Sequence, residues 1–352
     1  MKTPDFRLWG LAPAWIIMAF TLILPIAIVL MVSFATRGAY GGFEWGFSPA
    51  SYTQILFEEG WEGETEFTAQ YLWIIGRTLW LAGLTTLICA ALALPAAYTI
   101  AQAGGRAKAV LIYLVTLPFW VSMIVRVYAW IIILGNDGVI EKTLRGLRLV
   151  ADIDSLLFTN GAMLTGLVYS YIPLMILPVF ASIEKLDPAL IEASHDLYGS
   201  RFTTARRVIL PLAMPGLMAG AILVFVPCLG AVLEPILLGG GKAMLMGNLI
   251  QTQFGGGRNW PFGAAIAVVL MVLVTALLPI AMRAEPAAPK RAETTYRALI
   301  VSVVTLAARH PDMRLSAVIQ GLNFGIFTAS WLGLALHLTS PAMGYGTDDV
   351  GY

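Results

Sequence analysis

Long, uninterrupted runs of apolar residues dominate this chain, and shorter polar segments separate them. A membrane-spanning helix needs about 20 mostly apolar residues to cross roughly 30 Å of hydrocarbon. Such runs cover residues 11–34, 71–100, 110–134, 161–183, 212–238, 261–282 and, apart from the others, 315–338. Strands of a membrane barrel would alternate apolar and polar residues, so these continuous runs predict helices. The pattern predicts an all-α polytopic membrane protein.

The first run could instead be a secretory signal. Lys2 and Arg7 precede it, and Ser33-Phe34-Ala35 resembles a small-x-small cleavage site. However, a run over 11–34 is far longer than the roughly 7–15 apolar residues of a signal peptide. We therefore expect an uncleaved anchor.

Composition narrows the class of protein. Hydrophobic residues make up 58% of the 352 residues and charged residues only 12%, about half of what soluble domains carry. The mean hydropathy is +0.78. These values exclude a soluble enzyme and a disordered chain, and a net charge of +1 excludes a nucleic-acid binder that relies on a strong field. Cys89 and Cys228 lie in apolar runs and suggest neither a disulfide framework nor a metal site. We expect no catalytic residues, metal or cofactor.

The density of Lys and Arg in the polar segments predicts the orientation. These residues are denser in 1–10, 101–109, 184–211 and at Arg283 than in 35–70, 135–160 and 239–260. The difference predicts a cytoplasmic N-terminus. The outside acidity is concentrated in Glu58, Glu59, Glu62, Glu64 and Glu66. This stretch is either a solvated loop or an acidic vestibule that attracts cations or a basic partner.

Segment 184–211 predicts two short helices. Asp187 can cap a helix whose first residue is Pro188, residues 189–198 allow about three turns, and Gly199 can adopt the left-handed conformation that ends it. Ser200 can cap a second helix, which we expect to end at Pro211 as the fifth span begins.

The first of these helices is amphipathic. One face carries Leu190, Ile191, Ala193, Ser194 and Leu197, and the remainder carries Glu192, His195 and Asp196. A helix that lies on a bilayer would present Lys or Arg on its polar face. Acids and a histidine favour a docking element.

This segment resembles a known family. Glu192-Ala193-Ser194, followed by Val208-Ile209-Leu210-Pro211, is similar to the EAA loop of ATP-binding-cassette importer permeases, which reads E-A-A, three residues, G, nine residues, I-x-L-P. Ser194 replaces the second Ala and Val208 replaces Ile. Tyr198 occupies the glycine position, with Gly199 one place later.

Flanking stretches resemble spermidine/putrescine permeases in particular. They are residues 117–120, 124–130, 237–242, 246–250 and 258–261, and the likeness extends from about residue 8 to 283. The resemblance implies a six-span type I importer subunit that pairs with a second permease, cytoplasmic ATPase subunits and a periplasmic solute-binding protein. It also implies that the ATPase-coupling residues are Glu192, Ala193, Ser194, Leu197, Tyr198, Gly199 and Pro211. Gly239-Gly240-Gly241-Lys242 has the wrong spacing for an ATP-binding P-loop.

Charges within the apolar runs are candidates for the substrate path, because each costs at least about 2.5 kcal/mol at the centre of a membrane helix. Arg126 and Glu234 can pair with each other, can each snorkel or bind backbone carbonyls, or Glu234 can bind a cationic cargo. In the third case Tyr128, Trp130, Tyr169 and Tyr171 would offer aromatic faces. Polyamine permeases resemble this region with Pro-Glu where this chain reads Glu234-Pro235-Ile236, so the acid is displaced by two positions.

Four segments follow from this reading. Residues 1–70 form the anchor span and an outside loop, 71–283 the transporter transmembrane domain, 284–314 a Pro/Ala-containing linker, and 315–352 an extra span. The last two resemble the middle of a major facilitator transporter. They are either a fusion or truncation, or a genuine accessory span that would place Tyr352 outside.

The sequence therefore predicts an inner-membrane permease subunit of an ATP-driven importer for polyamines or a related small cationic solute, in contact with membrane lipid. A secondary carrier of the major facilitator type is the alternative, suggested by the tail and the membrane charges. A non-transporting scaffold is a third reading. The EAA-like loop separates the first from the second, because a carrier needs no ATPase dock.

Overall fold

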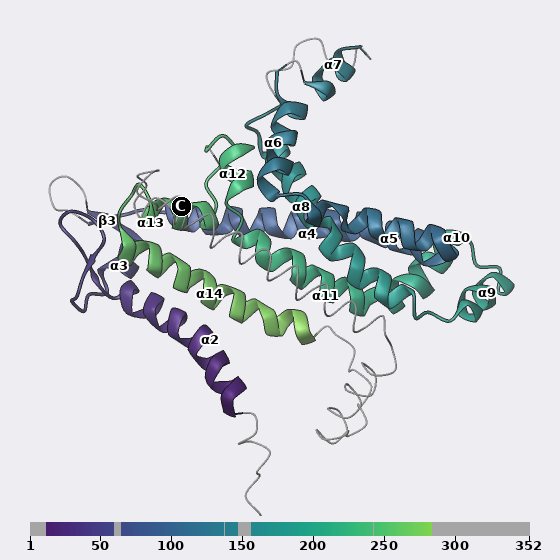
Figure 1. The fold of residues 1–352 in the computed structure, drawn as a ribbon, viewed down its shortest axis with the longest axis horizontal. Helices are drawn as coiled ribbons and strands as arrows, with labels where there is room; N and C mark the ends of the chain where they lie inside the picture. The colour runs from purple at the N-terminus through teal and green to yellow at the C-terminus, as the bar shows by residue number, and fades with distance from the viewer. Residues whose placement is uncertain (1–11, 60–64, 137, 147–155, 242, 284–352) are drawn as a thin grey trace, which may run out of the picture. The chain divides into compact units, whose positions relative to one another are not determined.

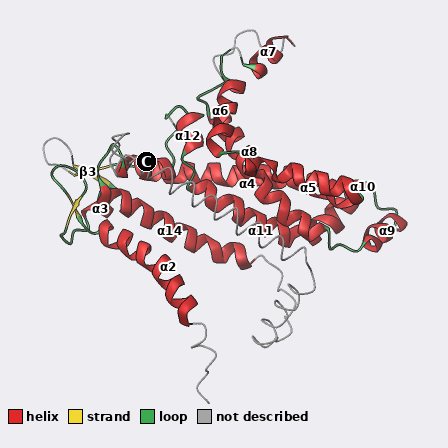
Figure 2. Cartoon of the chain, viewed as in Figure 1, coloured by secondary structure: helices red, strands yellow, loops and turns green. Residues whose placement is uncertain are grey.

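The computed structural model describes residues 12–59, 65–136, 138–146, 156–241 and 243–283. The chain divides into two compact units, Met1–Pro286 and Ala287–Tyr352. The predicted linker and the run at 315–338 lie outside the described residues, so the fold below concerns the first unit. Helices make up nearly all of it (Figure 2).

The long helices are α2 (Ala12–Ser33), α4 (Gln70–Gln102), α5 (Gly105–Trp120), α6 (Met123–Leu134), α8 (Asn160–Ile183), α11 (Leu210–Leu229) and α14 (Trp260–Arg283). The short helices are α3 (Ala50–Thr53), α7 (Val139–Gly146), α9 (Pro188–Asp196), α10 (Arg201–Thr204), α12 (Leu233–Leu237) and α13 (Met246–Phe254), and a π-helical turn covers Ala205–Ile209. Two small antiparallel hairpins pair β1 (Thr36–Arg37) with β2 (Phe43–Glu44) and β3 (Phe57–Glu59) with β4 (Thr65–Phe67).

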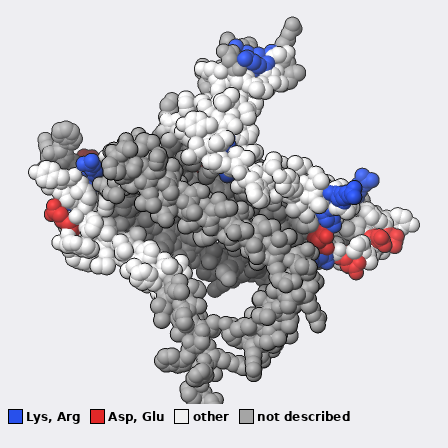
Figure 3. Space-filling view, in the orientation of Figure 1, with Lys and Arg blue, Asp and Glu red and all other residues white. Residues whose placement is uncertain are grey.

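Five helical runs in the described part of the chain are long and apolar enough to cross a membrane. They are Gln70–Gln102, Met123–Thr143, Asn160–Ile183, Arg201–Leu229 and Trp260–Leu277, and a shorter apolar helix covers Ala19–Ser33. On the face drawn in Figure 3, most of the visible charged residues lie around α7, around α9 and α10, and near the hairpins. The prediction of a helical membrane protein is confirmed.

Two predicted spans are not continuous helices. The run 110–134 is divided into α5 and α6, because Val121 and Ser122 are extended. Pro118 has no amide to complete the last turn of α5, and the amide of Val121 reaches back only to the carbonyl of Pro118, at 3.3 Å. α6 then leaves the direction of α5 (Figure 1). Similarly, the run 212–238 breaks after Leu229 and resumes as α12.

The core lies where α4, α8 and α11 pack together. Small residues of α4, Ala93 and Ala97, are fully buried against Met175 and Val179 of α8. Small side chains let the backbones of membrane helices approach closely. α9 and α10 lie at one end of these helices, and the hairpins lie at the other (Figure 1). The core thus connects the α9 end of the molecule to the hairpin end.

Candidate functional site

The start of α9 follows the sequence prediction. Asp187 Oδ1 accepts a hydrogen bond from the amide of Ala189 at 3.0 Å, and Pro188 occupies the first helical position. The carboxylate satisfies one of the amides that have no partner within the helix, and proline has no amide to leave unsatisfied. The helix therefore begins at a fixed point.

The end of α9 differs from the prediction. The left-handed residue is Tyr198, with φ of 59°, and not Gly199. The amide of Tyr198 donates to the carbonyl of His195 at 2.9 Å, and the amide of Gly199 donates to that of Ser194 at 2.8 Å. These two bonds form a Schellman motif. In this motif the residue that follows the C-cap is left-handed, and because the C-cap is Leu197, that residue is Tyr198. The EAA pattern places its glycine at the same position, so the spacing alone could have identified it.

Gly199 has a different reason to be glycine. A Cβ atom there would lie 2.6 Å from the carbonyl oxygen of Ser194 and 2.7 Å from its Oγ. Both distances are shorter than any ordinary contact. The turn after α9 therefore needs a residue without a side chain for close packing, not for a left-handed backbone.

Some residues of the apolar face predicted for α9 pack against the protein, and others are exposed. Ile191 and Ser194 are half-buried, and Ser194 Oγ lies 2.8 Å from Oγ1 of the buried Thr204. Ala193 and Glu192 are exposed. Leu197 is 82% exposed and Tyr198 99% exposed. Leu190 of α9 and Phe202 of α10 are also exposed, and we call these four apolar residues the loop patch. Exposed apolar surface of this kind marks an interaction site.

Pro211 does not end a helix as predicted. Ser200 caps α10 by accepting from the amide of Thr203 at 3.2 Å, as expected, but the backbone then continues through the π-helical turn Ala205–Ile209 into α11. In an α-helix, the ring of Pro211 would collide with the carbonyl of Arg207. A wider turn relieves this collision. The loop and the fifth span are therefore one helical run, Arg201–Leu229.

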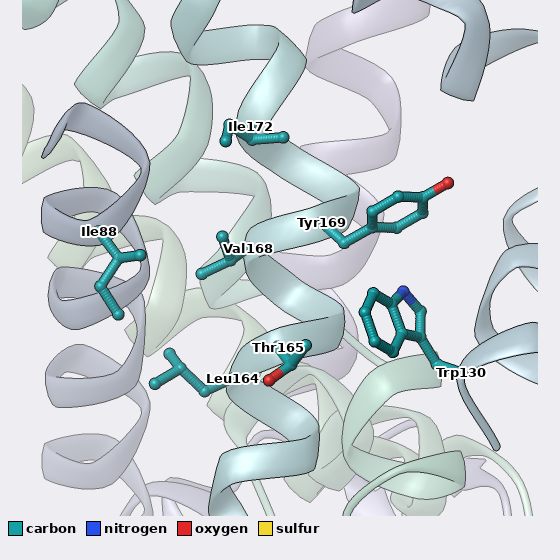
Figure 4. Close-up of a pocket in the computed structure, with 7 residues that line it drawn as sticks. All are labelled: Ile88, Trp130, Leu164, Thr165, Val168, Tyr169 and Ile172. Carbon is teal, nitrogen blue, oxygen red and sulfur yellow. The ribbon is translucent and has the colours of Figure 1, made fainter. Parts of the chain in front are cut away.

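A second candidate site lies between α4, α6 and α8. Trp130 and Tyr169 meet edge to face, with ring centroids 5.6 Å apart and planes at 74°. They line a cavity of about 330 Å³ together with Ile88, Leu164, Thr165, Val168 and Ile172 (Figure 4). The structure thus brings together two of the four aromatic residues proposed for the substrate path.

The other two aromatic residues lie elsewhere. The hydroxyl of Tyr171 donates to the carbonyl of Pro227 at 3.5 Å, and its ring packs against the core of α4, α8 and α11. Tyr128 is exposed on α6. Neither residue lines the cavity that holds Trp130 and Tyr169.

Glu234 and Arg126 form no ion pair among the described residues. Glu234 is 0% exposed, and its Cγ lies 3.5 Å from the position of a Cβ on Gly166 of α8. Both of its carboxylate oxygens, and Nε and Nη1 of Arg126, are buried without a hydrogen-bond partner in the described part of the chain. Complete burial also excludes snorkelling by Glu234. A buried charge without a partner costs several kcal/mol.

Glu234 faces inward on its helix. On α12, Glu234 is fully buried whereas Ile236 is 39% exposed. Residues two apart on a helix point to nearly opposite sides, about 200° around the axis. The acid of this chain therefore points into the packing between α6 and α8, and an apolar side chain takes the exposed position.

Comparison with known proteins gives a consistent family. Residues 91–284 match the family described as binding-protein-dependent transport system inner membrane component. The chain is 35% identical to the spermidine/putrescine transport system permease protein PotB of Haemophilus influenzae, over 80% of this chain and 93% of that protein. It is 34% identical to PotB of Escherichia coli, over 77% and 94%. It is also 37% identical to the inner membrane ABC transporter permease protein YdcU of Escherichia coli, over 60% and 71%.

The fold is likewise similar to a solved structure. A crystal structure of a bacterial ABC transporter involved in the import of the acidic polysaccharide alginate has a chain that superimposes with a TM-score of 0.61. The superposition covers 79% of this chain and 96% of that one, at 18% sequence identity. At this identity the likeness concerns the fold alone.

Proposed function

The chain belongs to the binding-protein-dependent ABC transporter permeases, a family of multi-pass inner-membrane subunits without ATPase activity, and from this premise we propose that its cargo is a polyamine or a related small cationic solute. The names of the relatives that align over most of their length support this cargo. The observation that carries the coupling mechanism is the unbroken helical run Arg201–Leu229, which begins directly after the turn that ends α9 and continues as the fifth span.

The loop patch supports docking of a cytoplasmic ATPase. Leu197 and Tyr198 are almost fully exposed at a turn whose backbone is fixed by two hydrogen bonds. A rigid apolar projection suits a groove on a partner. Because α10, the π-helical turn and α11 are one helical run, movement of the ATPase at the loop would be transmitted to the fifth span. Glu192 lies exposed beside the patch.

The orientation and the remaining partners follow from this docking. The α9 end is cytoplasmic, which agrees with the dense Lys and Arg of 184–211 and places the N-terminus inside. α2 serves as the first of six spans. The family description names a binding protein as a required partner. We propose that this periplasmic protein delivers cargo at the hairpin end and that a second permease completes the translocation path.

The cavity of Trp130 and Tyr169 is the proposed start of the solute path. Aromatic faces attract an ammonium group by about 0.5–2 kcal/mol, and the buried carboxylate of Glu234 accepts no hydrogen bond from the described residues. We place the substrate contacts at Trp130 and Tyr169; Glu234 does not line their cavity, and its proposed role is to attract the cation through its charge. Tyr171 packs the core rather than binding cargo.

Glu192→Lys tests the coupling. Uptake of labelled putrescine and spermidine should be lost while the protein still inserts in the membrane, and the ATPase should no longer copurify. Arg106→Glu is the matched control, because it reverses the charge of an exposed residue near the start of α5, outside the loop around α9. Unchanged uptake in Glu192→Lys, or uptake that persists when ATP is depleted and the proton gradient is kept, would support a secondary carrier instead.

A further inference from the structure

A single cation lies near the hairpin end of α4, between two exposed tryptophans. Trp73, Arg77 and Trp80 are spaced by four and three residues, so they share one face of the helix. Trp73 is 73% exposed and Trp80 70% exposed. We propose that this face, with the facing end of α8, binds the phosphate group of phosphatidylglycerol.

The depth of Arg77 agrees with a lipid headgroup. α4 has 33 residues and is about 50 Å long at 1.5 Å per residue. Because the hydrocarbon core is about 30 Å thick, a centred helix extends about 10 Å beyond it at each end. Arg77 lies about two turns, or about 10 Å, beyond Gln70. It is therefore at the boundary between headgroups and hydrocarbon, where tryptophan also concentrates.

The charge of Arg77 has no counter-ion within the described residues. Its Nη2 donates to Oδ1 of Asn160 at the start of α8, and neither ion pair of the described part involves it. A guanidinium has five N–H donors in a planar fork that matches the oxygens of a phosphate. At the headgroup boundary, the phosphate of an anionic lipid is the ligand within reach of this guanidinium.

The shape of the site fits a whole lipid rather than a free anion. A cavity of about 760 Å³ lies between the first part of α4 and the start of α8. Its lining residues are Trp73, Gly76, Arg77, Trp80, Leu81, Leu84, Asn160, Gly161 and Leu164. The leucines lie on the membrane side of Arg77 and provide an apolar floor for an acyl chain. The lining contains no Asp or Glu that could receive an ethanolamine ammonium, so phosphatidylglycerol is favoured over phosphatidylethanolamine.

Native mass spectrometry of the purified full chain tests the site. The protein is exchanged into detergent with equal amounts of phosphatidylglycerol, phosphatidylethanolamine and phosphatidylcholine. Wild type should retain phosphatidylglycerol, and Arg77→Gln should retain about tenfold less, since bonds to charged groups are the stronger ones. Arg37→Gln is the matched control, because Arg37 is an exposed arginine on β1 that contacts only the backbone of Gly257. Equal retention by wild type and Arg77→Gln would overturn the proposal.

Asn160→Asp provides an independent test in case Arg77→Gln does not fold. It supplies Arg77 with an internal counter-ion, so lipid should be lost while the guanidinium remains. Inorganic phosphate at millimolar concentration should not displace the lipid. Displacement would show that the site binds any phosphate anion and is not specific for a lipid, which would overturn the proposal. A photo-crosslinking residue at Trp80 should label lipid, whereas labelling of a partner protein alone would overturn the assignment. None of these readouts depends on uptake.

Discussion

Glu234 combines complete burial with two carboxylate oxygens that accept no hydrogen bond from the described residues. Such a group lowers the stability of the fold, because removing a charged or polar group from water without a partner costs free energy. Proteins retain destabilising groups of this kind mainly where function needs them. The loss of stability and the proposed contact with an ammonium group therefore have the same origin.

Glu234→Gln should separate these two effects. Removing the charge should raise the thermal midpoint of the detergent-purified protein, corresponding to about 1–3 kcal/mol. It should also lower uptake of putrescine about tenfold or more, because the amide cannot neutralise a cation. Glu44→Gln, at an exposed glutamate on β2, should change neither value. Raised stability with undiminished uptake would remove Glu234 from the substrate path.

The sequence could predict only part of the aromatic site. Trp130 and Tyr169 do share a cavity. Tyr169 and Tyr171 lie two apart on α8, so they could never have faced the same cavity, and the helical period alone excluded one of them. The lack of an ion pair between Arg126 and Glu234 was not predictable, since it depends on how α6 and α12 are placed.

At the scale of the element, the predicted helix start was right and the predicted stop was off by one residue. Asp187-Pro188 is a local signal that tertiary structure does not alter. The stop depended on which residue takes the left-handed conformation, and glycine was assumed to do so because it does so at no steric cost. The exposed Tyr198 takes it instead, since Gly199 is needed for close approach to Ser194. Pro211 was predicted to be a terminator because a π-helical turn has no simple sequence pattern.

Gly199→Ala tests this account of the turn. The added methyl would overlap the carbonyl of Ser194, so the Schellman motif should open and Leu197 and Tyr198 should leave their fixed positions. We expect uptake and ATPase copurification to fall about tenfold while membrane insertion is unchanged. Gly104→Ala is a matched control, because Gly104 lies in another loop at the same end and a Cβ there meets nothing within 4 Å. Equal activity of the two variants would show that the turn needs no glycine.

At the scale of the whole molecule, hydropathy predicted where membrane helices occur but not where they break. A window of average hydropathy is insensitive to the extended residues Val121 and Ser122, because they are as compatible with a membrane as their neighbours. The contacts of α4, α8 and α11 depend on which small residues face one another. Which residues face one another depends on packing between segments that are distant in sequence, and a hydropathy pattern along the chain carries no information about it.

Removal of residues 284–352 should leave uptake intact. The family match covers 91–284, and Met1–Pro286 is a compact unit by itself, so every contact proposed for coupling and for cargo lies before the cut. A chain ending at Arg283 should insert, bind the ATPase and transport putrescine at the wild-type rate. A control cut after Phe254 also removes α14, which packs against α2 and α13, and should abolish uptake. If the first truncation inserts and assembles but does not transport, the tail takes part in translocation and the transporter unit extends beyond the family match.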